Sequence, residues 1–301
     1  MNRLDLKVGF QCNNRCFFCI QGDKRFTCPN KTDKEIKTIL KRMRKSHDGV
    51  VFTGGEPTVR PELISWVSYA KELGYKVIQI QSNGRMFYYK KYCKDIVNAG
   101  ANEFALAVHG SCKEIHEGLT QAPESFLEVT NGIKNLKELN QYVLTNSVVT
   151  AMNYKDLPQL AKLLVKLKVD QFQFAFMHIN AIIMHDPKLV DKIVPRYEKV
   201  MPYIKQGIDI GSKAGIKVMV EAVPYCFMKN YEKYISEQYI PFTSVIDDKI
   251  ELADYGAYRK NSGKAKGPQC KNCSKNNICE GPWREYPALF GWSEFKSMTI
   301  E

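Results

Sequence analysis

The sequence predicts an α/β protein, a partial (β/α)6 barrel of the TIM-like type followed by a small cysteine-rich subdomain. Apolar segments typical of strands alternate with amphipathic segments typical of helices, which is the pattern of a parallel sheet. Six strand–helix units within about 180 residues are too few for a closed eight-stranded barrel. The regular pattern fades after Cys226, and the tail carries a second group of cysteines.

Short apolar or alternating runs predict the strands, and longer amphipathic runs between them predict the helices. We expect strands over 4–10, 49–53, 76–81, 103–108, 142–149, 171–177 and 217–223. We expect helices over 32–45, 61–73, 88–98, 125–139, 156–168 and 187–214, with Thr32 and Asp33 as candidate caps of the first. Beyond them, 227–237 is a possible helix, 240–263 look irregular, and 263–267 form a Lys/Gly linker. Two domains are therefore predicted, 1–223 and 224–301.

The bulk composition excludes several protein classes. The chain has 301 residues, of which 25% are charged, and no apolar run approaches membrane-spanning length. Its start lacks the pattern of a signal peptide, so we expect a cytoplasmic protein that does not contact a membrane. The net charge of +12 is compatible with nucleic acid or an acidic substrate as partner. A Lys-rich solvated surface is the favoured explanation, because no compact basic and aromatic motif accompanies the charge.

The cysteines fall into two groups of three. Cys12, Cys16 and Cys19 lie in a polar loop after the first predicted strand, and the second group spans 270–279. Cytosolic thiols stay reduced, so the groups indicate metal sites rather than disulfides. Three converging thiolates suit a cubane iron–sulfur cluster and leave its fourth iron free for a small molecule. Zinc would usually require four ligands from paired motifs.

The run Cys12-x3-Cys16-x2-Cys19, with Phe18 before its third cysteine, resembles the signature of the radical S-adenosylmethionine (SAM) superfamily. The resemblance covers roughly 4–223. It implies a [4Fe–4S] cluster on these three cysteines, with the amino and carboxylate groups of SAM on the open iron. It also implies reductive cleavage of SAM, with an electron from a donor such as flavodoxin or ferredoxin. The resulting 5′-deoxyadenosyl radical would abstract hydrogen from the substrate.

The segment Gly54-Gly55-Glu56-Pro57 follows the second predicted strand and matches the family motif that holds the methionine amino group. Glycines let backbone groups approach a ligand closely, and Glu56 can accept a hydrogen bond from an ammonium group. A simple turn from strand to helix is the alternative reading of this segment.

Four more polar residues follow or lie in later strands, at positions where the resemblance implies contacts with SAM. They are Ser82, Asn83, His109 and Asn146. Ser82 and Asn83 are expected to reach the ribose or the carboxylate, and the other two the nucleoside. Ligand sites of parallel sheets lie at the carboxyl ends of the strands, which fits these positions. An asparagine within a strand satisfies a neighbouring backbone group equally well.

The second group, Cys270-x2-Cys273-x5-Cys279, resembles the core of the C-terminal SPASM/twitch extension of many of these enzymes. The resemblance implies one auxiliary [4Fe–4S] cluster, with Cys226 as its fourth ligand. The longer form of the extension has a further cysteine where this chain has Gly281, so the short twitch type fits better. A structural zinc site on the same four thiolates is the alternative.

The resemblance implies a radical SAM enzyme, and we expect an oxidative modification of a ribosomally made peptide: a cross-link, a dehydrogenation or an epimerisation. The alternatives are a small polar metabolite such as a sugar, nucleoside or nucleotide, and a non-catalytic iron–sulfur or zinc scaffold. No room for a leader-binding module is expected before the first strand, and the chain ends SMTIE rather than in the Gly-Gly tail of GTP cyclases. If four thiolates hold the auxiliary cluster, electron transfer is favoured over direct binding of substrate.

No catalytic residue is assigned from the sequence. Cys28 and Cys112 lie on loops near the expected open face, where a donor role is conceivable, and Cys93 is expected in the core. His178 and His185 follow the sixth strand and are candidates for the wall of the substrate cavity, or for solvated loop positions.

Overall fold

One curved, open sheet organises the protein. The computed structural model describes residues 1–248 and 250–299, in which the strand order is β7-β6-β5-β4-β3-β2-β1-β8-β9. The strands are β1 (Arg3–Lys7), β2 (Gly49–Thr53), β3 (Val77–Ser82), β4 (Glu103–Ala107), β5 (Tyr142–Val149), β6 (Gln171–Phe176), β7 (Lys217–Glu221), β8 (Thr243–Ile246) and β9 (Glu251–Leu252). β1 to β7 follow one another in parallel, which confirms the α/β class and the partial barrel.

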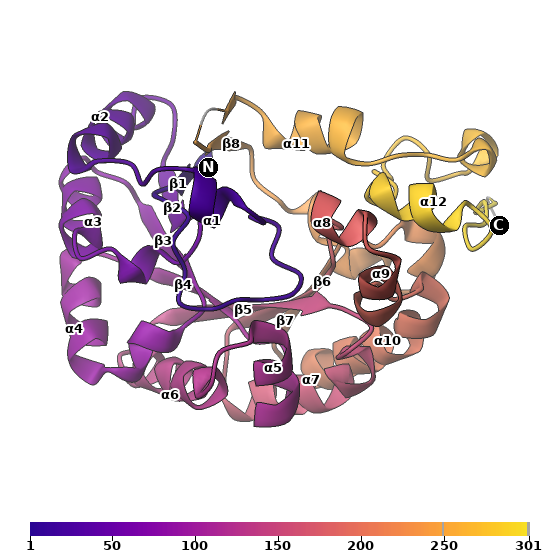
Figure 1. Ribbon diagram of the computed structural model, residues 1–301, viewed down its shortest axis with the longest axis horizontal. Coiled ribbons are helices and arrows are strands. Elements are labelled where there is room, and N and C mark those ends of the chain that lie inside the picture. The colour runs from indigo at the N-terminus through magenta and orange to yellow at the C-terminus, as the bar shows by residue number, and fades with distance from the viewer. Residues whose placement is uncertain (249, 300–301) are drawn as a thin grey trace.

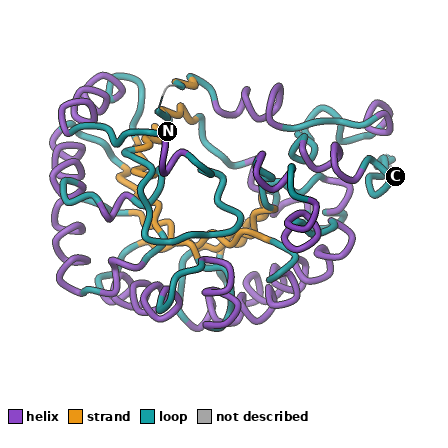
Figure 2. Tube along the Cα trace, viewed as in Figure 1, coloured by secondary structure: helices purple, strands orange, loops and turns teal. Residues whose placement is uncertain are grey.

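Most helices lie on the outer side of this sheet (Figure 1). The longer ones are α2 (Asp33–Met43), α3 (Leu63–Glu72), α4 (Lys90–Ala99), α6 (Ser125–Glu138), α7 (Leu157–Lys166) and α10 (Tyr197–Lys213). The shorter ones are α1 (Lys24–Thr27), α5 (Lys113–Thr120), α8 (Ala181–Met184), α9 (Pro187–Ile193), α11 (Tyr255–Tyr258) and α12 (Glu285–Phe290). Figure 2 shows the same arrangement, with strands inside a ring of helices and a long loop after β1 crossing the inner side. No helix among the described residues is long and apolar enough to cross a membrane.

Local sequence signals explain where α2 begins. The Thr32 hydroxyl accepts a hydrogen bond from the backbone N–H of Glu35, and the Glu35 carboxylate accepts one from the backbone N–H of Thr32. This reciprocal capping box satisfies two donors that the first helical turn leaves without partners. The expected cap at Thr32 is therefore confirmed.

Three expectations about secondary structure are wrong. The single helix expected over 187–214 is two helices, α9 and α10, because Pro195 lies between them and forces Val194 into an extended conformation. The segment 240–263, expected to be irregular, contains β8, which pairs in parallel with β1. Helix α5 was not expected at all, since eight residues give little periodicity.

Alternation along β1 separates two environments. Leu4 and Leu6 are fully buried, and they alternate with the partly exposed Arg3, Asp5 and Lys7. We call the side of the sheet that carries these polar residues the inner face. The guanidinium of Arg3 pairs with Glu103 on β4 at 3.0 Å, and the ammonium of Lys7 pairs with Asp5 at 3.0 Å. The inner face of β1 is therefore polar, and its two cations are paired with carboxylates.

Helix α5 is fixed to the end of β4 by a buried histidine. The backbone N–H of His109 donates to Nδ1 of His116 at 3.1 Å, so the ring of His116 is neutral with its proton on Nε2. Burial lowers the pKa of His116 to about 4. An unfolded chain protonates this histidine below about pH 6.5, whereas the folded chain resists protonation until about pH 4.

The protein should therefore lose stability on acidification through this window. For the cluster-free protein, we expect the free energy of unfolding to fall by about 2 kcal/mol more between pH 7 and pH 5 than it does in His116→Asn. Asparagine keeps an acceptor near the position of Nδ1 and does not titrate. Urea unfolding at both pH values measures the difference. Identical pH profiles for the two proteins would contradict the assignment of a buried neutral His116.

Candidate functional site at the strand ends

The loop after β1 brings three thiols together. Burial raises the pKa of Cys12 to about 11 and that of Cys16 to about 12, and Cys19 adds to both shifts through its charge. Thiolates so close together and so poorly solvated require a compensating positive charge. Iron bound by three thiolates supplies that charge, so this set of donors fits a cubane cluster.

The cysteine loop rests on α5. The backbone N–H of Arg15 donates to the carbonyl of Thr120 at 2.8 Å, and that of Phe17 donates to the carbonyl of Leu119 at 3.2 Å. Two carbonyls that the end of α5 leaves without helical partners are thereby satisfied. The ring of Phe18 packs edge-on against His109, with 4.7 Å between centroids. The expected aromatic residue before the third cysteine thus joins the loop to the end of β4.

The glycine pair at 54–55 braces the start of the same loop. The backbone N–H of Gly55 donates to the carbonyl of Gly9 at 2.8 Å, and that of Glu56 donates to the carbonyl of Gln11 at 2.8 Å. A Cβ on Gly54, whose φ is +128°, would lie 2.1 Å from the carbonyl oxygen of Gly9. A Cβ on Gly55 would lie 2.3 Å from that of Gln11. Only glycine allows two backbones to approach so closely directly before Cys12.

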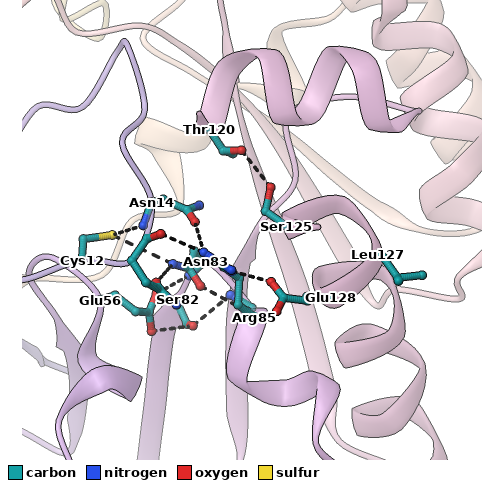
Figure 3. Close-up of polar contacts among 12 residues, drawn as sticks. Cys12, Asn14, Glu56, Ser82, Asn83, Arg85, Thr120, Ser125, Leu127 and Glu128 are labelled. Atoms are coloured by element: carbon teal, nitrogen blue, oxygen red, sulfur yellow. Dashed lines mark hydrogen bonds and ion pairs between the residues drawn. The ribbon is translucent and has the colours of Figure 1, made fainter. Parts of the chain in front are cut away.

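The carboxylate of Glu56 holds the next strand end in place (Figure 3). It accepts hydrogen bonds from the hydroxyl of Ser82 at 2.8 Å and from the backbone N–H of Asn83 at 2.6 Å. The backbone and hydroxyl of Thr58 add two more, at 3.0 and 2.6 Å. Burial raises the pKa of Glu56 and these four bonds oppose the rise. Three of the bonds fall on Oε1, so Oε2 keeps room for one more donor, and the expected contact with an ammonium group stays a prediction.

Asn83 and Arg85 connect this turn to the cysteine loop (Figure 3). Nδ2 of Asn83 donates to the side chain of Asn13 at 2.6 Å and lies 3.9 Å from the sulfur of Cys12. Nη1 of Arg85 donates to the carbonyl of Asn13 at 2.7 Å, while its Nε pairs with Glu128 on α6. Sequence reasoning missed Arg85, although it directly follows the Ser82-Asn83-Gly84 turn.

His109 follows β4, and Asn146 lies in the middle of β5. Only 3% of His109 is exposed, and its Nδ1 accepts the backbone N–H of Val148 at 3.3 Å. The Asn146 side chain accepts a hydrogen bond from Gln173 at 3.5 Å, and Gln173 in turn donates to Glu221 at 2.6 Å. Glu221, at the end of β7, is a further polar residue that the sequence did not indicate. The nucleoside contacts of His109 and Asn146 stay predictions.

A cavity lies in the C-terminal part of the chain. Its wall includes Cys226, Cys270, Cys273 and Cys279, and its volume of about 20 Å³ is enough for about one water molecule. Burial raises the pKa of Cys226 to about 11, and the charges of the other three cysteines act in the same direction. The fold therefore brings the four cysteines expected to act together to one place.

Backbone donors already point at these sulfurs. The N–H of Met298 donates to the sulfur of Cys273 at 3.4 Å. The backbone of Lys296 bonds the sulfur of Cys226, and that of Gly281 bonds the sulfur of Cys279. Gly281 has φ +84°, and a Cβ there would lie 2.0 Å from the carbonyl oxygen of Ala265. Hydrogen bonds from N–H groups stabilise sulfur in its thiolate form, so the donor set fits an iron–sulfur cluster or zinc.

The remaining cysteines and histidines are placed as follows. Cys93 is fully buried and its thiol donates to the carbonyl of Phe87 at 3.0 Å, which confirms the expected core position. Cys28 and Cys112 are partly exposed on loops. The ring of His178 stacks on Trp283, with 4.2 Å between centroids, and His185 is exposed. Within 1–248 and 250–299, no three His, Cys, Asp or Glu side chains are already arranged to hold a single ion.

The glycine brace leads to a prediction. We expect Gly55→Ala to displace residues 10–11 and to reduce the iron bound by Cys12, Cys16 and Cys19 by more than half, because the added Cβ has no free space. Gly118→Ala is the matched control, since a Cβ there meets nothing within 4 Å. It lies within α5, so alanine should leave iron binding unchanged and raise stability by up to about 1 kcal/mol. Iron content after anaerobic reconstitution is the measurement, and equal iron in both variants would rule out the brace.

Comparison with known proteins identifies a family and several relatives of this chain. The family model described as the radical SAM superfamily matches residues 6–164. A probable GTP 3′,8-cyclase of Saccharolobus islandicus is 28% identical over 174 residues, which are 56% of this chain and 54% of that protein. One of Thermococcus kodakarensis is 27% identical over 156 residues, 51% of this chain and 50% of that protein. The chain thus spans about half the length of the curated relatives it matches.

Two solved structures share the fold over most of the chain. SuiB of Streptococcus suis, bound to the precursor peptide SuiA, has a TM-score of 0.70 at 16% identity, covering 95% of this chain and 72% of that one. anSMEcpe with bound AdoMet has a TM-score of 0.68 at 18% identity, covering 95% of this chain and 90% of that one. Since the family model covers more than half of the 301 residues and includes the cysteine loop and the glycine brace, the chain belongs to the radical SAM superfamily.

Proposed function

We propose that this radical SAM enzyme uses two [4Fe–4S] clusters for an oxidative modification of a ribosomally made peptide. The chemistry supplied at the first site is the reductive cleavage of SAM to a 5′-deoxyadenosyl radical, with electrons from a flavodoxin or ferredoxin. Cys12, Cys16 and Cys19 would hold the cluster there. The backbone at 54–55, held against the start of the cysteine loop, and the Ser82-Asn83 turn, held by Glu56, would orient SAM.

One observation supports the proposal of a second cluster. Cys226 lines the same cavity as Cys270, Cys273 and Cys279, although at least 44 residues separate it from them in the chain. The spacing Cys270-x2-Cys273-x5-Cys279, which resembles the twitch extension, favours an iron–sulfur cluster over zinc at these cysteines. Four thiolate ligands would leave no iron free for the substrate, so the proposed role is to accept an electron. Loss of an electron from the substrate makes the net reaction an oxidation.

The charges of the inner face favour a peptide over a polyphosphate. The cations at Arg3 and Lys7 are each paired with a carboxylate on the same face. Further along, β7 ends in another carboxyl group, Glu221, rather than in a cation. A triphosphate needs cations that are not already neutralised. SuiB bound to a precursor peptide and anSMEcpe bound to AdoMet and a peptide are consistent with a peptide substrate on this fold.

A nucleotide such as GTP is the second candidate, and sequence similarity favours it. The curated relatives at 27–28% identity are probable GTP 3′,8-cyclases, and the match covers 56–58% of this chain. The two candidates share the SAM cleavage step and differ in the substrate that the radical meets.

Reconstitution with iron and sulfide under anaerobic conditions tests the two clusters. We expect about eight iron atoms per chain, and formation of 5′-deoxyadenosine after addition of SAM and dithionite. Cys16→Ala should bind about four iron atoms and form no 5′-deoxyadenosine. Cys226→Ala should also bind about four iron atoms, but it should still cleave SAM to 5′-deoxyadenosine. Cys28→Ala is the control and should match the parent protein. About four iron atoms with one zinc would disprove the second cluster.

A nucleotide assay separates the two substrates. Because the cations of the inner face are paired, we expect GTP to leave the rate of 5′-deoxyadenosine formation within twofold of the rate without it. ATP serves as the control for general effects of nucleotides. Tenfold stimulation by GTP, together with a modified nucleotide in the mass spectrum, would replace the peptide proposal with the nucleotide one.

A further inference from the structure

Unpaired polar atoms gather at the cavity of the four cysteines. Three side-chain atoms in its wall are buried and have no hydrogen-bond partner among the described residues: the hydroxyl of Tyr225, Nε2 of Gln269 and Oδ1 of Asn276. Buried polar groups in folded proteins nearly always have partners, so several orphans at one cavity indicate that a bound group completes them.

The donor or acceptor character of these unpaired atoms limits which chemical group can bind in the cavity. The hydroxyl of Tyr225 and Nε2 of Gln269 are donors, so they require an acceptor. The acceptors that this cavity gathers are sulfurs: those of Cys273 and Cys279 already accept backbone N–H groups. The inorganic sulfides of an iron–sulfur cluster would add further sulfur acceptors to this set.

We propose that Tyr225 and Gln269 donate hydrogen bonds to sulfur atoms of the auxiliary cluster and raise its reduction potential. This inference rests on the proposed second cluster. Reduction adds negative charge to the cluster, and a donor directed at its sulfur stabilises the reduced state more than the oxidised one. A higher potential suits a centre that accepts an electron from a substrate. Tyr225 and Gln269 are thus positioning and tuning residues, not ligands.

The two donors come from different segments that meet at the cavity. Tyr225 directly precedes Cys226 at the end of the barrel, and Gln269 directly precedes Cys270 in the tail. Each donor therefore sits beside a ligand of the proposed cluster, in the two segments that must come together to form it. Asn276 would join them if its amide turned to present Nδ2.

The test measures the potential of the auxiliary cluster in the full-length chain. Cys12, Cys16 and Cys19 are replaced by alanine so that a single cluster titrates, and its reduction is followed by electron paramagnetic resonance at controlled potentials. Tyr225→Phe and Gln269→Leu each remove one donor at nearly constant volume. We expect each to shift the ratio of reduced to oxidised cluster about tenfold toward oxidised at fixed potential, equal to 59 mV, and the double variant to shift it further. Tyr258→Phe, which removes an exposed hydroxyl of the same subdomain, should not shift it.

The outcomes separate this inference from the proposal on which it rests. About four iron atoms in the triple-alanine protein, with unchanged potentials in Tyr225→Phe and Gln269→Leu, would overturn the inference and leave the second cluster standing. Such a result would mean that water accepts the hydrogen bonds of the two donors. Zinc in place of iron would overturn both this inference and the proposed second cluster. If Gln269→Leu fails to retain its cluster, Gln269→Met provides a second replacement. The reduction potential of the cluster in Gln269→Met then tests the inference in the same way.

Discussion

The close approach of two backbones at the carboxyl end of β1 and β2 is the constraint on which the site depends. Gly54 and Gly55 lie against Gly9 and Gln11 so tightly that no side chain fits between them. The hydrogen bonds formed there fix the chain one residue before Cys12. From the same turn, Glu56 reaches across to the end of β3 and holds the Ser82-Asn83 turn. One short segment thus fixes both the start of the cysteine loop and the Ser82-Asn83 turn beside it.

A second set of contacts supports the cysteine loop from helices α5 and α6. The last carbonyls of α5 accept its backbone N–H groups, and Arg85 ties it to α6 through Glu128. The inner face beneath it carries charges in pairs rather than in a single-sign patch, which limits the fields that act on a bound radical precursor. Rigid support and balanced charge both suit a reactive species that must meet only its substrate.

Buried ion pairs brace the C-terminal part, and one of their carboxylates bonds the barrel. Arg259 pairs with Glu280 at 2.9 Å, and Lys264 pairs with Glu237, whose carboxylate also accepts the backbone N–H of Ala222 just after β7. All four charged side chains are almost completely buried, so removing one partner would leave another uncompensated. This network and the pairing of β8 with β1 hold the cavity of the four cysteines in a fixed place beside the sheet.

The sequence by itself determined the alternating architecture, the cysteine loop and the glycine motif, because strand and helix periodicity and ligand spacing are local properties of the chain. It indicated that Cys12, Glu56, Ser82 and Asn83 lie at strand ends, and the fold brings them together. Only the tertiary structure decided the rest. Arg85, Glu221, the β8 pairing and the donors Tyr225 and Gln269 depend on which segments meet in space, and contacts between residues far apart in the chain leave no periodic signal.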